Sequence, residues 1–357
     1  MVKNEGRNNT HPKVMCKSKL LGAIVLIQNY LESENIKPSI NIELEGAYLD
    51  NHNLSQNKFY QKANLQLKNL RIKAKLKPEF WHNQWEYESD FQIGNTVQTI
   101  DSYKRFLENI DAIFAPQVSK LQPINYDWQK VKDLTIHIPN STQINISLWN
   151  QGLNMLANKN YAFFLQNLLI ENSINNLIFF IPNQENLDRL FLKEKYSLQD
   201  KLMCPNDISG GNQGSIACYL EKNKKNLPND FDINADDLNY KILDHEHKWQ
   251  KNARIEFRLA SASLEYNLEL HIFFVMLIVL ESLISYQENQ NYQATKNSYP
   301  IPEKFYHQEE DNIVLRYKNN SFFKNKITLF STQYPKLAKQ LELIEKEIEI
   351  FISDNIR

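Results

Sequence analysis

Apolar and polar residues alternate with a period of two along several stretches of the chain, the spacing of a strand with one buried face. In the stretch Ile40–Leu49, the apolar residues Ile40, Ile42 and Leu44 alternate with polar ones. Further strands are predicted at Gln66–Lys77, Gln84–Phe91, Leu134–Leu148 with a break at Pro139, Ser215–Leu220 and Arg254–Leu259. The pattern therefore predicts strands spread along most of the chain.

Other stretches place apolar residues three or four positions apart, which is typical of a helix that packs on one side. Such helices are predicted at Lys19–Glu34, Thr99–Phe114, Tyr161–Phe180, Leu268–Ser285 and Lys336–Ile352. Strands and helices are intermixed without regular alternation, so we expect an α+β fold on an antiparallel or mixed sheet. We expect residues 1–17 to be a disordered lead and residues 18–357 to form one domain, with a helical extension from about residue 312.

Several predicted strands carry acidic residues on one face. Glu43 and Glu45 share a face, Glu86 has Glu88 beside it, and Glu256 lies between two arginines. On any single strand, such acids are also what a solvent-exposed face carries. Taken in order along the chain, however, these strands and several other segments match the segments of a known protein family.

They resemble the catalytic domain of glutamine synthetase over roughly residues 40–285. The matching segments are Glu43-Leu44-Glu45, Glu79 with Gln84-Trp85-Glu86, Asp111 to Pro116, Ile144 to Trp149, Ile181 to Leu190, and Arg254 to Arg258. The last segment matches nearly residue for residue, and all six occur in the family's order. The resemblance implies a curved antiparallel or mixed sheet flanked by helices.

The resemblance also implies two sites for Mg²⁺ or Mn²⁺. It assigns Glu45, Glu79 and Glu86 to the first site, and Glu43, Gln143 and Glu256 to the second. Gln143 stands where the family has a histidine, and its amide oxygen is still a hard ligand. Glu79 precedes Glu86 by seven residues, so an irregular turn near residues 81–83 is needed to bring both to one side.

The resemblance implies that ATP and a small carboxylate bind nearby. Arg258 matches an arginine that stabilises the transferred phosphoryl group, Arg189 matches one that binds the substrate carboxylate, and Asn212 belongs to the nucleotide segment. Other features are lost. The glycine loop that embraces the substrate corresponds to residues 138–141, which contain no glycine. Gln213 replaces a phosphate-binding arginine, and residues 201–205 contain no catalytic acid. Residues 1–39 are also too few for the family's N-terminal β-grasp domain.

Two functions are compatible with these residues. The first is an ATP-dependent ligase that joins a carboxylate to ammonia or an amine through an acyl phosphate. The second is a catalytically inactive relative that acts as a scaffold or regulatory binding protein. In either case, we expect the site to be open or to be completed by another chain, either a second copy in a homo-oligomer or a different protein.

The composition of the chain argues against some classes of binding partner. The chain has 357 residues, with 41 basic and 42 acidic ones, and lacks the basic excess of a nucleic-acid-binding protein. The apolar run Ile272–Leu280 is about half of the ~20 residues that a membrane span needs, so we expect a buried core helix and no membrane partner. The N-terminus has no secretory signal, and Cys16, Cys204 and Cys218 show no zinc-ligand spacing, so we expect a cytoplasmic protein with free thiols.

Overall fold

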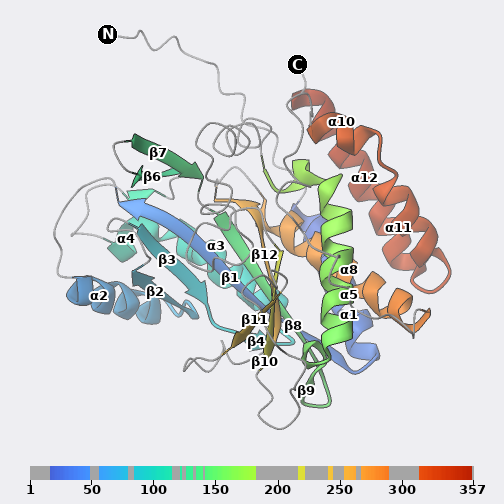
Figure 1. Ribbon diagram of the computed structural model, residues 1–357, viewed down its shortest axis with the longest axis horizontal. Coiled ribbons are helices and arrows are strands. Elements are labelled where there is room, and N and C mark those ends of the chain that lie inside the picture. The colour runs from blue at the N-terminus through green and yellow to red at the C-terminus, as the bar shows by residue number, and fades with distance from the viewer. Residues whose placement is uncertain are drawn as a thin grey trace.

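The structure is a computed structural model, drawn as a ribbon in Figure 1. The described residues are 17–48, 56–78, 84–114, 121–122, 126–131, 134–139, 141–181, 216–221, 240–243, 253–262, 267–288 and 313–355. Of the expected lead at residues 1–17, residues 1–16 lie outside them, and Lys17 is already the first residue of a helix.

A ten-stranded sheet forms the centre of the fold, and its main path runs β11-β10-β12-β8-β1-β3-β2. Its strands are β1 Ile36–Tyr48, β2 Ala74–Pro78, β3 Gln84–Ser89, β4 Gln92–Ile93, β5 Leu121–Gln122, β8 Ser141–Asn150, β9 Leu153–Asn154, β10 Ile216–Glu221, β11 Tyr240–Leu243 and β12 Arg254–Ser261. Among these, β10 and β11 pair in parallel and the other pairs are antiparallel. Two further strands, β6 Tyr126–Val131 and β7 Leu134–Pro139, form a separate hairpin. The expected α+β fold on a mixed sheet is therefore confirmed.

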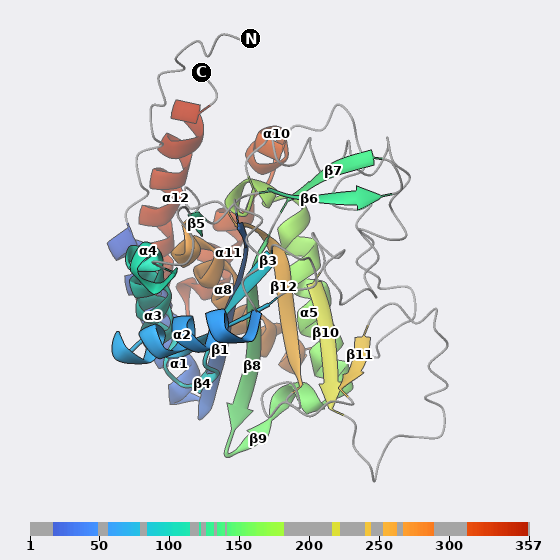
Figure 2. The same ribbon diagram turned by 90° about the vertical axis from the view of Figure 1, so that its left-hand side faces the viewer.

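Helices cover the apolar face of this sheet (Figure 2). They are α1 Lys17–Ser33, α2 Gln56–Asn69, α3 Thr96–Glu108, α4 Ile110–Phe114, α5 Lys159–Ile174, α8 Leu268–Glu288, α10 Ile313–Lys318, α11 Phe322–Ser331 and α12 Pro335–Asn355. Helices α1 and α3 pack on β1, α5 packs on β10, and α8 lies against α1 and α5. Helix α12 packs on the outside, against α1 and α11.

The alternation in the strands separates two chemically different faces. On the helical side, β1 contributes Ile40, Ile42 and Leu44 to the core, and these side chains are fully buried. Strand β8 contributes Ile144 and Ile146 in the same way. Because side chains alternate across a strand, the residues between them project from the opposite face, and these are polar.

Helix α8 is the most apolar element. Among the described residues, it is the helix long and apolar enough to cross a membrane by length and composition, and 78% of its most apolar window is buried inside the protein. Phe274 of this helix packs against Phe257 of β12 and Phe180. The predicted burial of this segment in the core is thus confirmed.

The structure corrects one predicted strand. Residues 66–77 are not a continuous strand: α2 occupies residues 56–69, and β2 begins only at Ala74. Phe59, Ala63 and Leu67 are four residues apart and buried, which is helical spacing. The apparent alternation crossed a helix end and the turn at Arg71, where φ is 54°.

Two predicted helices are shorter than expected. The helix expected over residues 99–114 is interrupted at Asn109, between α3 and α4. The helix expected over residues 161–180 ends at Ile174, and a single 3₁₀ turn, Leu177–Phe179, follows it. Another 3₁₀ turn, Met155–Ala157, precedes α5.

Strand β2 lies at one end of the sheet path and is tied to α2. The side-chain amide of Asn64 donates to the carbonyl of Leu76 and accepts from its N–H, both at 2.8 Å. These two bonds imitate the pairing that a further strand would supply. The outer edge of β2 is thus held by a helix.

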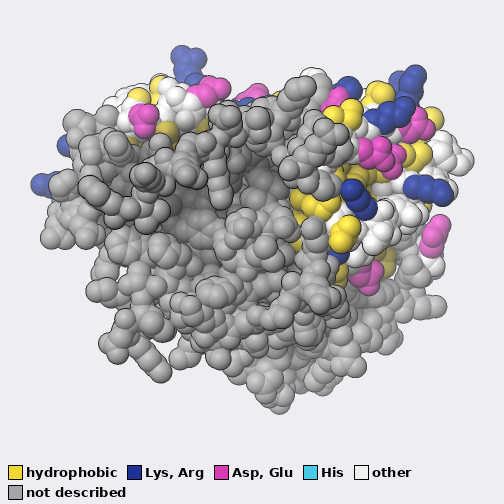
Figure 3. Space-filling model, turned by 90° about the horizontal axis from the view of Figure 1, so that it is seen from above, with side chains coloured by type: hydrophobic (Ala, Val, Ile, Leu, Met, Phe, Trp, Pro, Cys, Tyr) yellow, Lys and Arg dark blue, Asp and Glu magenta, His cyan; other side chains and the backbone are white. Residues whose placement is uncertain are grey.

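The C-terminal helices contribute a mixed charged surface. Seen from above, the described side chains at the right of Figure 3 include both basic and acidic groups, on the side where Figure 1 places α10 to α12. Within α12, the apolar residues Leu337, Leu341 and Ile344 are buried, which confirms an amphipathic helix.

Candidate functional site

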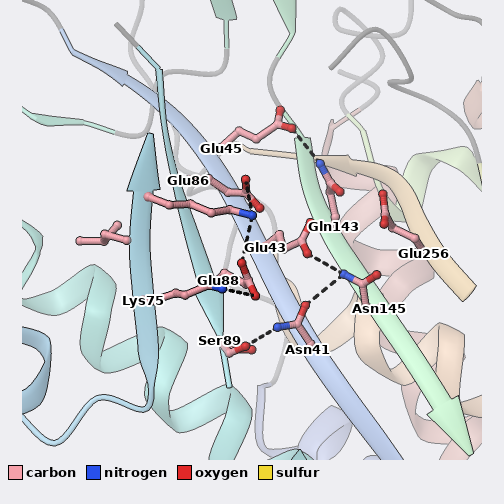
Figure 4. Close-up of polar contacts among 12 residues, drawn as sticks. Asn41, Glu43, Glu45, Lys75, Glu86, Glu88, Ser89, Gln143, Asn145 and Glu256 are labelled. Atoms are coloured by element: carbon pink, nitrogen blue, oxygen red, sulfur yellow. Dashed lines mark hydrogen bonds and ion pairs between the residues drawn. The ribbon is translucent and has the colours of Figure 1, made fainter. Parts of the chain in front are cut away.

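The polar face of the sheet brings acids from distant parts of the chain into adjacent rows (Figure 4). Glu43 of β1 lies opposite Glu88 of β3, and Glu45 lies opposite Glu86. On the other side of β1, Glu43 lies opposite Gln143 of β8. The register of β8 with β12 then adds Glu256, opposite Asn145.

These acids are buried, which excludes the simple interpretation of a solvent-exposed strand face. Each of the five is at most 5% exposed: Glu43, Glu45, Glu86, Glu88 and Glu256. A buried carboxylate is costly unless positive charge or hydrogen-bond donors compensate it. The groups that surround each acid therefore decide what the face can do.

Two lysines of β2 meet the acids of β3. The ammonium of Lys77 lies 3.1 Å from Glu86 and 3.0 Å from Glu88. Lys75, two residues earlier on the same face, lies 3.2 Å from the second oxygen of Glu88. Because β2 pairs with β3, both lysines project to the same side as the acids.

Two arginines meet the acid of β12. Glu256 forms ion pairs with Arg258 and, at 3.6 Å, with Arg254. The register between β12 and β8 shifts between Phe257 and Ala260, and Arg258 lies inside this irregularity. Its guanidinium also donates to the side-chain oxygen of Gln143 at 3.0 Å.

Amides link the two ends of the cluster. The amide nitrogen of Gln143 donates to Glu45 at 2.7 Å, and the N–H of Ser141 donates to the other oxygen of Glu45 at 3.4 Å. Asn145 donates to Glu43 at 3.1 Å and accepts from Arg254 at 2.8 Å. Acids, amides and cations therefore form one hydrogen-bonded network.

The electrostatics follow from this arrangement. Burial raises the pKa of Glu43 well above its usual value, and repulsion from Glu86 and Glu256 raises it further, against the opposing effect of Lys77. Burial also raises the pKa of Glu45, although Arg258 and the hydrogen bond from Ser141 act against it. Burial lowers the pKa of Lys77, but the carboxylates of Glu86, Glu43 and Glu88 outweigh this and raise it overall.

The structure brings together most, not all, of the expected site residues within its described part. Those found in the cluster are Glu43, Glu45, Glu86, Gln143, Glu256 and Arg258. Glu79, Arg189 and Asn212 lie outside the described residues, as do Gln213 and residues 201–205. Their roles stay predictions.

Six further residues belong to the network although the sequence pattern predicted no binding or catalytic role for them: Asn41, Lys75, Lys77, Glu88, Asn145 and Arg254. Lys75 and Lys77 could have been assigned to the polar face from the sequence, because they alternate with the apolar residues Ala74 and Leu76. Asn145 alternates with Ile144 and Ile146 in the same way. Which residues lie opposite them depends on strand order, which the pattern does not give.

The described residues do not fit the two-metal arrangement that the resemblance implies. No group of three or more His, Cys, Asp or Glu side chains in the described part of the chain is arranged to hold a metal ion. Glu86 and Glu256 already pair with cations of the protein. The oxygen of Gln143, the one atom of that side chain able to bind a metal, accepts from Arg258.

Comparisons with known proteins add similarities at low sequence identity. The structure is similar to a novel glutamine synthase homolog, with a TM-score of 0.48 and 10% identity over 94% of this chain and 71% of that one. It is similar to Plasmodium falciparum glutamine synthetase, with a TM-score of 0.47 and 12% identity over 94% and 76%. It is also similar to a complex of GmaS with ADP, with a TM-score of 0.47 and 11% identity over 94% and 75%. No family model and no curated protein matches the chain.

Proposed function

We propose that the protein is a glutamine-synthetase-type chain that has lost the metal-dependent ligase reaction and acts as a scaffold or regulatory binding protein. The observation that carries this proposal is the neutralisation of the buried acids by the chain's own groups. Glu86 is paired with Lys77 and Glu256 with Arg258. A divalent cation would have to displace these charges before it could bind.

The sequence losses support the same proposal. Residues 138–141 contain no glycine, so the close backbone approach to a substrate that the family uses is not available. Gln213, in place of a phosphate-binding arginine, supplies a neutral amide where a charged clamp is expected. Both changes weaken binding of the reacting groups.

A specific observation favours the second candidate, an ATP-dependent ligase that joins a small carboxylate to ammonia or an amine. Acids of β1, β3 and β12 converge on one face together with Arg258, as the sequence resemblance requires. In this candidate, Mg²⁺ or Mn²⁺ would supply charge neutralisation as phosphate is transferred. Arg258 would then stabilise the phosphoryl group, Arg189 would hold the carboxylate, and Asn212 would contact ATP.

Release of ADP separates the two candidates. The purified protein is incubated with ATP, Mg²⁺ or Mn²⁺, and combinations of carboxylic acids with ammonia or amines, glutamate included. We expect no ADP above the level seen without acid and amine. ADP release that requires both an acid and an amine, and that is abolished by Arg258→Met, would overturn the proposal in favour of the ligase.

The partners and location remain part of the proposal. We propose a cytoplasmic protein that binds neither nucleic acid nor membranes, and that associates with a second copy or another chain at the polar face.

A further inference from the structure

We infer that the ammonium group of Lys77 is a built-in replacement for a divalent cation among the carboxylates of Glu43, Glu86 and Glu88. This inference stands on the geometry of the sheet and does not depend on whether the protein turns over a substrate. The acids as they stand around Lys77 are not arranged as a metal site, and the inference predicts that they can take up a divalent cation only when the lysine is removed.

The position of Lys77 relative to the three acids is the first support. Its nitrogen lies within 3.1 Å of one oxygen of Glu86 and one of Glu88. Lys77 is directly opposite Glu86 in the pairing of β2 with β3, and Glu88 is directly opposite Glu43 in the pairing of β3 with β1. One ammonium group therefore contacts two acids of β3, and the charge of Glu43 on the adjacent strand β1 also acts on it.

The cost of leaving these acids uncompensated is the second support. Two like charges ~4 Å apart repel by about 4 kcal/mol at an effective dielectric constant near 20. Burial adds to this cost, since Glu43, Glu86 and Glu88 are each at most 5% exposed. The face therefore needs a positive charge at this position, and a lysine that belongs to the chain cannot dissociate as an ion can.

The remaining acids of the face are compensated by other groups of the chain. Glu256 pairs with two arginines, and Glu45 accepts hydrogen bonds from Gln143 and Ser141. Lys77 thus supplies positive charge to the acids of β1 and β3 that these groups do not compensate, namely Glu43, Glu86 and Glu88. Lys75 contributes at its rim, where its side chain is 44% exposed and contacts Glu88.

Lys77→Ala tests the inference, because it removes the charge and leaves space for a hydrated ion. Lys75→Ala is the matched control, since this lysine is on the same strand and the same face but at the rim. Binding of Mn²⁺ alone is measured by the loss of its free paramagnetic resonance signal, and thermal unfolding is followed with Mn²⁺ and with a chelator.

We expect the wild type and Lys75→Ala to unfold at the same temperature with Mn²⁺ as with the chelator. Lys77→Ala should bind Mn²⁺ more tightly than the wild type, by a factor of about 10 or more. It should also unfold at a lower temperature in chelator and regain part of the loss with Mn²⁺. Wild-type protein that binds Mn²⁺ as tightly as Lys77→Ala would overturn the inference, and so would a Lys77→Ala variant with no gain in Mn²⁺ binding.

A second variant covers the case in which Lys77→Ala does not fold. Lys77→Met with Glu86→Gln removes a cation and an acid together, so we expect it to fold and to show no gain in Mn²⁺ binding. A gain in this double variant would count against the inference. If the wild type binds Mn²⁺ as tightly as Lys77→Ala but releases no ADP, the inference is overturned and the proposed function still stands.

Discussion

The surroundings of a single side chain decide its chemistry here, and His271 is a clear case outside the polar face. This histidine of α8 is buried, with its ring 5.8 Å from that of Phe180. Burial lowers its pKa to about 3, against the opposing effect of a hydrogen bond with the backbone of Phe179. The residue is therefore a neutral member of the core.

This lowered pKa predicts a loss of stability in acid. In the unfolded chain, His271 takes up a proton below its ordinary pKa of about 6.5, while in the folded protein it stays neutral until about pH 3. Its contribution is therefore present above pH 6.5 and is lost as the pH falls from there. We expect about 2 kcal/mol less stability at pH 5 than at pH 8 from this group.

Urea unfolding of His271→Gln at both pH values measures this effect. Glutamine does not titrate, so the difference between pH 8 and pH 5 should be smaller in the variant by about 2 kcal/mol. Glu43 and Glu45 also have shifted pKa values, but they are present in both proteins and cancel in the comparison. An identical pH dependence in variant and wild type would show that His271 is not the source.

The individual residues of the site were partly predictable. The acids could be assigned to one face because Glu43 and Glu45 alternate with apolar residues. Their partners could not be assigned, since Lys77 and Glu86 meet only through the pairing of β2 with β3. A pattern along one strand holds no information on which strand lies beside it.

At the scale of elements, β1 and β3 pack so closely at Gly46 that only a glycine fits there without a clash. It lies opposite Trp85 in the pairing of β1 with β3, and the indole ring covers it. A Cβ atom at this position would lie 2.6 Å from Cε2 of Trp85. Trp85 is fully buried and contacts Phe106 and Phe114, so the ring has little freedom to move.

We therefore expect Gly46→Ala to destabilise the protein by about 1–3 kcal/mol, the usual cost of overpacking a core. Gly22→Ala is the matched control. It lies within α1, and a Cβ there meets nothing nearer than the side chain of Gln340 at 4.0 Å. That variant should gain about 0.5–1 kcal/mol, because alanine favours a helix. Chemical denaturation compares the two, and equal effects of the same sign would contradict the overlap at Trp85.

Elements with a strong period were predicted well, and those at a change of period were not. Strands β1, β3, β8 and β12 follow the alternation, because one face of each is buried by helices. Helix α2 was mistaken for part of a strand, since Leu70, Ile72 and Leu76 alternate across its end. The helix ends where the backbone N–H groups of Leu70 and Arg71 donate to carbonyls of its last turn. The order of apolar and polar residues does not show where such backbone hydrogen bonds form.

At the scale of the whole molecule, the core is continuous from the first described helix to the last. Leu20 of α1, Ile42 of β1, Phe257 of β12 and Leu341 of α12 all belong to the same cluster of buried residues. Elements far apart in the sequence therefore depend on each other for burial. The C-terminal helices are part of this core as well as an extension of it.

This continuity predicts one cooperative unfolding transition, as expected for a single domain over residues 18–357. Calorimetry should give a ratio of calorimetric to van't Hoff enthalpy near one. Tryptophan fluorescence and circular dichroism should report the same midpoint. Two separate transitions would show that the C-terminal helices, or another part, form an independent unit.

The tie between Asn64 and Leu76 reaches further than the edge that it holds. The same short strand that receives these two bonds supplies the positive charge of the polar face, since Lys75 and Lys77 flank Leu76. The location of that charge thus depends on an asparagine on a helix that contributes no acid to the cluster. A substitution of Asn64 can consequently alter the electrostatics of the polar face by changing the position of β2.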